Sequence, residues 1–169
     1  MSEDEPQMNT EPQINMETRA AELCDATTQP VRDFVYRYYL TLAGVPNDAW
    51  RFYTVGARYT HVDGRGPEEA RDPGPAVGQY QIHVNITHQR FSECTFLIRS
   101  INEQPVADGR VHVLVTGDTS RNQRVAESFI QSFVLDYVRE INQYAVTNSI
   151  LKVYTSLPRP PSPSTFSSE

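Results

Sequence analysis

The spacing of hydrophobic residues predicts three helices in the first half of the chain. The first helix begins at Pro30, which suits a first helical turn, and ends near Gly44. A second, short helix follows the capping candidates Asn47 and Asp48. The third is expected over residues 76–89, after an exposed loop at 63–75 that is rich in glycine, proline and charge. The apolar stripe of the first helix consists of Val31, Phe34, Val35, Tyr38 and Leu42, and the second helix carries Trp50, Phe52 and Tyr53.

Alternating patterns predict a sheet in the second half. Strands are expected over residues 57–62, 91–102, 110–118, 127–138 and 145–154. Asp108-Gly109 indicates a tight hairpin, because a type I′ turn needs positive φ at both central residues. Three helices followed by long strands predict an α+β fold with the helices packed on an antiparallel sheet.

Two of the predicted strands are apolar on both faces. A sheet with one wet face alternates between apolar and polar residues, and the strands around Val113 and Phe133 do not. Helices cover one face, so a second copy of the chain is expected to cover the other. The predicted dimer interface consists of Val113, Val115, Phe133 and Leu135.

The charge of the chain is concentrated at its start. The net charge is −6, and residues 1–30 alone hold seven acids and one base. We therefore expect a flexible acidic tail over 1–27, a folded domain over 28–157 and a Pro/Ser-rich linker over 158–169. The folded part is electrostatically balanced, so direct binding of nucleic acid by this domain is not expected.

The two cysteines and the absence of a signal pattern indicate an intracellular protein. Cys24 and Cys94 lack metal-ligand spacing, and a disulfide between them is disfavoured because Cys24 falls in the predicted tail. No apolar run of about 18 residues is present, and no basic-then-apolar leader opens the chain. The expected compartment is the cytoplasm, with the nucleus as the alternative.

Seven short segments carry a family resemblance. They are Val35-Tyr36-Arg37-Tyr38-Tyr39, Arg51-Phe52-Tyr53, Tyr59-Thr60-His61, Gly78-Gln79 leading to Ile82-His83, Phe91-Ser92-Glu93-Cys94, Gln131-Ser132-Phe133-Val134-Leu135 and Tyr144-Ala145-Val146-Thr147-Asn148. In this order they resemble the nuclear transport factor 2-like superfamily. The more specific resemblance is to the N-terminal domain of the Rasputin family, the Ras-GAP SH3-domain-binding proteins that assemble stress granules, and it covers residues 30–155.

The resemblance implies a cone-shaped α+β fold, a homodimer built through the sheet faces, and a groove for partner proteins. That groove accepts short linear motifs containing Phe-Gly, and RNA binding is expected in a larger scaffold protein beyond this domain. The matching aromatic positions are Phe34, Phe52 and Tyr144, with Val31, Arg37, Arg51 and Gln143 at the rim. From the residues alone, Phe34 and Phe52 fit an ordinary core equally well.

The sequence departs from the family pattern in the groove. Tyr144 stands where the family commonly has phenylalanine, and the neutral Gln143 stands at a charged rim position. A hydroxyl at the third aromatic position must reach water or a partner when a peptide binds, which retunes the choice of motif.

Catalytic and metal-binding functions are weighed against this interpretation. Ketosteroid isomerase-like enzymes share the superfold, and Tyr59, His61 and Asp63 would share one strand face, but Asp63 opens the predicted loop. His83 and His88 are five apart on a helix and do not share a ligand face. The sequence therefore predicts neither an enzyme nor a metal site, and no cofactor.

Two further alternatives concern partners. A carrier of Ran-GDP that binds nucleoporin Phe-Gly repeats would share the fold, but such carriers are compact single domains without an acidic leader and a proline-rich exit. The run from Pro158 to Pro163 is interpreted as a linker, with an SH3 or WW ligand as the alternative.

Overall fold

The computed structural model describes residues 16–64 and 74–155, with side chains described from residue 29 onward. Its elements are α1 (Met16–Gly44), η1 (Pro46–Phe52), β1 (Tyr53–Asp63), β2 (Ala76–Val77), α2 (Gln79–His88), η2 (Phe91–Glu93), β3 (Cys94–Pro105), η3 (Ala107–Gly109), β4 (Val111–Arg121), β5 (Glu127–Val138) and β6 (Gln143–Tyr154). The start of the predicted tail (1–15), most of the predicted loop (65–73) and the proline-rich segment lie outside the described residues.

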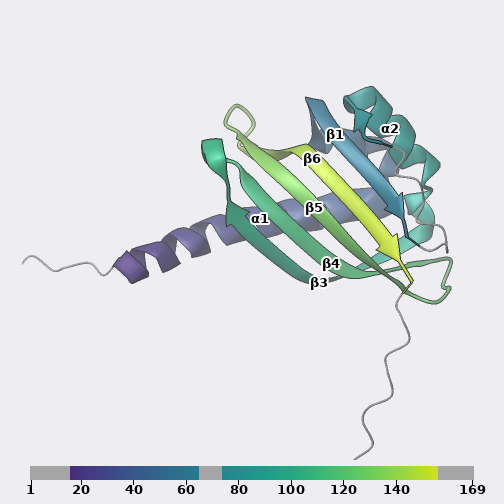
Figure 1. Ribbon diagram of the computed structural model, residues 1–169, viewed down its shortest axis with the longest axis horizontal. Coiled ribbons are helices and arrows are strands. Elements are labelled where there is room, and N and C mark those ends of the chain that lie inside the picture. Colours follow the sequence, from purple (N-terminus) through teal and green to yellow (C-terminus); the bar gives the residue numbers. More distant parts are fainter. Residues whose placement is uncertain (1–15, 65–73, 156–169) are drawn as a thin grey trace, which may run out of the picture.

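Helix α1 is longer than the sequence pattern predicts. It begins at Met16, so residues 16–27 are helical, and Pro30 lies inside it. A proline inside a helix removes one backbone donor, and here the helix continues through it. Figure 1 shows that the first half of α1 extends past the edge of the sheet, while the second half crosses it. The predicted start at Pro30 is therefore wrong, although the predicted stripe from Val31 to Leu42 is fully buried.

The other predicted helices are present with different bounds. The second is a 3₁₀ helix, η1, and Tyr53 already belongs to β1. The third begins at Gln79, because Ala76 and Val77 pair with β1 as the short strand β2. The predicted tight turn is confirmed, since Asp108 and Gly109 have φ values of 63° and 70°.

The sheet is mixed, which corrects the prediction of an antiparallel sheet. Its strand order is β2-β1-β6-β5-β4-β3, and β6 pairs with β1 in parallel. All other neighbours pair antiparallel. The parallel pair arises because β6 starts at the same end of the sheet as β1, so that Tyr53 faces Val146 and Asp63 faces Val153.

The core lies between α1 and the inner face of the sheet. Side chains alternate between the two faces of a strand, and the inward set on β4 and β5 includes all four residues predicted for the dimer interface. These residues are 0% exposed within a single chain and cannot contact a partner: Val113, Val115, Phe133 and Leu135. The sequence correctly indicated that these strands are apolar on both faces, but the residues assigned to the dimer interface lie on the face that α1 covers.

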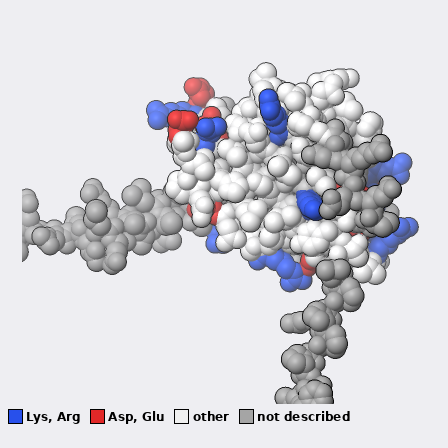
Figure 2. Space-filling model, viewed as in Figure 1, with Lys and Arg blue, Asp and Glu red and all other residues white. Residues whose placement is uncertain are grey.

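The outer face of the sheet carries its own apolar residues. Leu114, Ile130 and Val134 are half-buried, and Ile150 is 54% exposed. The strand registers bring these residues onto neighbouring strands of one face. Figure 2 views the molecule from this side and shows a largely uncharged face with some Lys or Arg side chains within it and further charged side chains around its margin.

The sheet leaves no room at Gly117, where β4 approaches both β3 and the ring of Phe129. A Cβ at this position would lie 2.8 Å from the Phe129 ring and against the carbonyl oxygen of Leu97. Gly117→Ala should therefore lower the free energy of unfolding by about 1–3 kcal/mol in urea titrations. Gly56→Ala in β1 is the matched control, because nothing lies within 4 Å of its Cβ position. Equal stability of the two variants would contradict this packing.

Candidate functional site

Two adjoining hollows lie between α1, η1 and the start of β6, and we call them together the α1–β6 groove. The smaller, of about 330 Å³, is lined by residues that include Phe52, Ile141 and Ala145. The larger, of about 920 Å³, extends along the exposed side of α1 past Tyr36 and Leu40. Both are lined by Arg37, Gln143 and Tyr144, so the hollows form one continuous depression.

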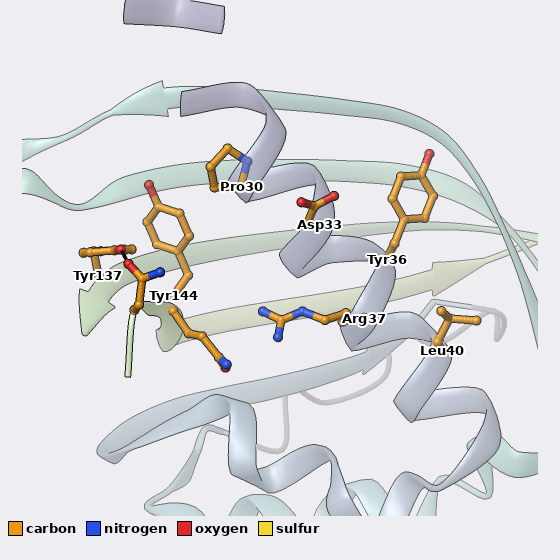
Figure 3. A pocket seen from close by; sticks show the side chains of 9 residues that line it. Pro30, Asp33, Tyr36, Arg37, Leu40, Tyr137 and Tyr144 are labelled. Atoms are coloured by element: carbon orange, nitrogen blue, oxygen red, sulfur yellow. Dashed lines mark hydrogen bonds between the residues drawn. The ribbon is translucent and has the colours of Figure 1, made fainter. Parts of the chain in front are cut away.

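The structure brings five of the seven predicted peptide-binding residues to this groove. Phe52 and Tyr144 are half-buried walls, whereas Arg37, Arg51 and Gln143 are exposed. In Figure 3 the side chain of Arg37 extends from α1 toward Tyr144 across the larger hollow. The groove thus combines two aromatic walls with two cations.

Val31 and Phe34 do not line the groove, which corrects their predicted role. Both are 0% exposed and belong to the core. Phe34 instead supports the groove from the core side. Its ring packs edge-to-face on the Phe52 ring with 5.7 Å between centroids, and the Tyr38 ring packs on Phe52 at 5.5 Å. Such pairs stabilise ring orientation, so the core fixes the wall of the groove.

Arg51 and Tyr144 at the rim of the groove each have electrostatic neighbours within the chain. The Nε of Arg51 lies 3.3 Å from Asp48, and its guanidinium lies 5.7 Å from the Trp50 ring. Partial burial raises the pKa of Tyr144, with Glu103 and Tyr137 adding to the effect. The Tyr144 hydroxyl therefore stays protonated near neutral pH and is available as a hydrogen-bond donor.

Several groove residues were missed from the sequence. They are Thr41, Val45, Asp48, Ile141 and Ala145 in the smaller hollow, and Pro30, Asp33, Tyr36, Leu40, Tyr137 and Asn142 in the larger. Tyr36 and Leu40 are large apolar residues on the polar face of the predicted first helix, 51% and 73% exposed. Large apolar residues on the polar face of a predicted helix indicate a binding surface, and this signal could have identified them from the sequence.

The interior of the cone is filled with hydrogen-bonded side chains. The hydroxyl oxygens of Tyr38 and Tyr53 lie 2.7 Å apart, and the Tyr39 hydroxyl donates to Gln131 Oε1 at 2.6 Å. Gln131 Nε2 donates to Ser149 Oγ at 2.9 Å.

The candidate catalytic residues from the sequence have little free space. The Tyr59 hydroxyl and His61 Nδ1 lie 3.4 Å apart, and both residues are buried. The hollow beside His61 measures about 30 Å³, far less than either hollow of the α1–β6 groove. No group of three His, Cys, Asp or Glu side chains that could hold a metal ion occurs among the described side chains of residues 29–64 and 74–155. In the same ranges, no helix has the length and apolar character to cross a membrane.

The comparisons with known proteins agree with this architecture. The family model of the nuclear transport factor 2 (NTF2) domain matches residues 31–153. The chain belongs to the NTF2 domain family. A G3BP-like protein of Schizosaccharomyces pombe is 29% identical over 119 residues, which is 70% of this chain. The aligned part is 26% of that relative, so the chain spans about a quarter of its length.

Solved structures of other proteins share the fold. The yeast UBP3-associated protein Bre5 superposes with a TM-score of 0.65 at 17% identity, covering 76% of this chain and 96% of Bre5. Bre5 has also been solved in complex with the deubiquitinase Ubp3. NTF2 from Cryptosporidium parvum gives a TM-score of 0.64 at 21% identity, covering 75% of this chain and 93% of that protein.

The buried tyrosines of this NTF2 domain make its stability sensitive to alkali. Burial raises the pKa of Tyr39, Tyr53 and Tyr59 well above the ordinary value of 10.0, and raises that of Tyr38 as well. A group whose pKa is raised on folding contributes stability below its unfolded pKa and loses it above. The urea midpoint should therefore fall as the pH rises through 10.0. Tyrosinate absorbance that appears before unfolding would contradict the buried network.

Proposed function

We propose that this NTF2 domain is a non-catalytic protein-interaction module that binds Phe-Gly-containing short linear motifs in the α1–β6 groove. The observation that carries the proposal is the aromatic wall of Phe52, which stands half-buried between a rigid core and an open groove. Burying the ring of a peptide phenylalanine against it contributes about 1.5–3 kcal/mol. The glycine of the motif has no side chain, so the peptide backbone can approach the aromatic wall closely.

The groove residues explain why a peptide, and not a small substrate, is the proposed ligand. The depression is open and long, and it presents the donors of Arg37, Arg51 and Tyr144 along its edge. Such an edge suits the carbonyl groups and acidic side chains of an extended peptide. The closed interior, filled by Gln131 and its tyrosine partners, argues against catalysis.

The relatives support a role in assembly. A curated relative is G3BP-like, and Bre5 is known as a UBP3-associated protein. By analogy, this domain connects a longer, RNA-binding scaffold protein to its partners in cytoplasmic stress granules, with RNA bound elsewhere in that protein. Bre5 in complex with a deubiquitinase illustrates the same use of the fold.

The outer face of the sheet is the proposed surface for self-association. Leu114, Ile130, Val134 and Ile150 contribute apolar surface there, with the exposed Lys152 beside Ile130, and two copies would cover this surface mutually. A dimer carries two α1–β6 grooves, so weak contacts to a partner with several motifs reinforce one another through effective concentration.

The aromatic wall is tested with calorimetry. Phe52→Ala should weaken binding of a Phe-Gly-Asp-Phe peptide by roughly tenfold or more, a loss of about 1.4 kcal/mol. Tyr144→Ala should weaken it too, and serves as the second variant because Phe52 also packs on the core. Tyr80→Ala, an exposed aromatic outside the groove, is the matched control and should bind normally. Unchanged affinity in both groove variants, with urea midpoints intact, would overturn the proposal.

Self-association is tested by light scattering. The unchanged chain should have the mass of a dimer, and Ile150→Glu should shift it toward that of one chain by placing carboxylates in the interface. Val125→Glu is the control, because Val125 is 88% exposed between β4 and β5 and away from the outer-face residues. A monomeric unchanged chain would refute the proposed interface.

A further inference from the structure

A further hollow lies between η1 and α2. It measures about 420 Å³ and is lined by Trp50, Gln79, Tyr80 and His83. None of these residues lines the groove, so the two sites are separate. We call it the η1–α2 hollow.

The η1–α2 hollow is held rigidly and has an unused polar atom. The Gln79 side-chain amide donates to the backbone oxygen of Tyr53 at 2.7 Å, which fixes the start of α2 against β1. His83 Nδ1 is buried and has no hydrogen-bond partner among the described residues. Trp50, which also lines the hollow, carries an indole N–H donor. The hollow therefore offers two aromatic rings and polar atoms at fixed positions.

Exposed apolar side chains continue from this hollow along the edge of the sheet. Tyr80 is 74% exposed, and Val77 on the edge strand β2 is 51% exposed. Gly78 joins the two elements through a 2.8 Å backbone hydrogen bond to Ala57 in β1. An apolar track thus runs from the hollow toward β1 and its neighbour β6.

Aromatic side chains with a free N–H are the usual receptors for polyproline. A polyproline II segment has no internal hydrogen bonds, packs its rings between aromatic side chains and accepts bonds through its carbonyls. Its conformation is preformed, so docking costs little entropy. The chain contains one such sequence, Pro158-Arg159-Pro160-Pro161-Ser162-Pro163.

This sequence is within reach of the η1–α2 hollow. It follows β6, whose end lies beside the end of β1, since Val153 pairs with Asp63. Ala57, which bonds to the start of α2, lies six residues back along β1, or about 20 Å at ~3.3 Å per residue. Pro160–Pro163 follow Tyr154 by six to nine residues, or about 19–28 Å in the polyproline II conformation at ~3.1 Å per residue. Figure 1 places β1 between β6 and α2, so the direct route follows the edge of the sheet.

We propose that the η1–α2 hollow is a docking site for the proline-rich segment 158–163 of the same chain. The proline rings pack against Trp50 and Tyr80, and the segment crosses Val77 on its way from β6. This contact fixes the direction in which the polypeptide leaves the domain. It does not depend on the function proposed for the α1–β6 groove.

The test uses Trp50, because it is the single tryptophan of the chain. In the full chain, Pro160→Gly combined with Pro161→Gly should shift Trp50 emission to the red and raise its quenching by acrylamide. The one indole cross-peak in a ¹H–¹⁵N spectrum should move in the same variant. Pro6→Gly combined with Pro12→Gly in the acidic leader is the matched control and should leave all three signals unchanged.

Two further measurements separate the alternatives. In a Tyr80→Ala background, the proline substitutions should have no additional effect on Trp50, because the docking wall is already lost. Dilution should not change Trp50 quenching, since the contact is intramolecular. Identical Trp50 signals with and without the prolines would overturn the proposal, and protection lost on dilution would assign the hollow to another chain's segment. Phe-Gly peptide affinity serves as an independent readout that these variants should not alter.

Discussion

The architecture depends on one aromatic seam between α1 and the inner face of the sheet. Tyr38 lies at its centre, with the rings of Phe133 and Phe52 at 5.1 and 5.5 Å. The same residue anchors the buried polar network through its hydroxyl. Because interiors are densely packed, a ring in this seam cannot shift without moving its neighbours. The core and the wall of the α1–β6 groove are therefore parts of one packed unit.

The interior and the outer surfaces of the domain differ in what their polar groups contact. The polar groups of the interior bond to one another: Gln131 accepts from Tyr39 and donates to Tyr38 and Ser149. The proposals above place function on the groove, the outer face and the η1–α2 hollow. Fold membership alone does not select among them, since the NTF2 fold serves unrelated functions.

The sequence predicted the element order and most of the core, because periodicity reports burial directly. The sequence-based prediction was wrong where one hydrophobic pattern fits more than one arrangement of the residues. Strands β4 and β5 are apolar on both faces, so alternation could not say whether Val113 or Leu114 points at the helix. Phe34 and Phe52 share a hydrophobic signature, yet α1 buries one completely and η1 leaves the other half-buried. Pro30 resembled a helix start, and only the three-dimensional structure shows α1 passing through it.

The parallel pairing of β1 with β6 has a consequence for how the chain acquires its structure. β1 is completed early in the chain, but its long neighbour in the sheet is the last strand, and only the two-residue β2 flanks its other side. Contacts between distant parts of a sequence form slowly, because a long loop must close first. During synthesis, β1 therefore waits for residue 154 to leave the ribosome. In a nascent chain that stalls before β6, the edge of β1 that β6 would cover stays open, and such an edge is a target for chaperones.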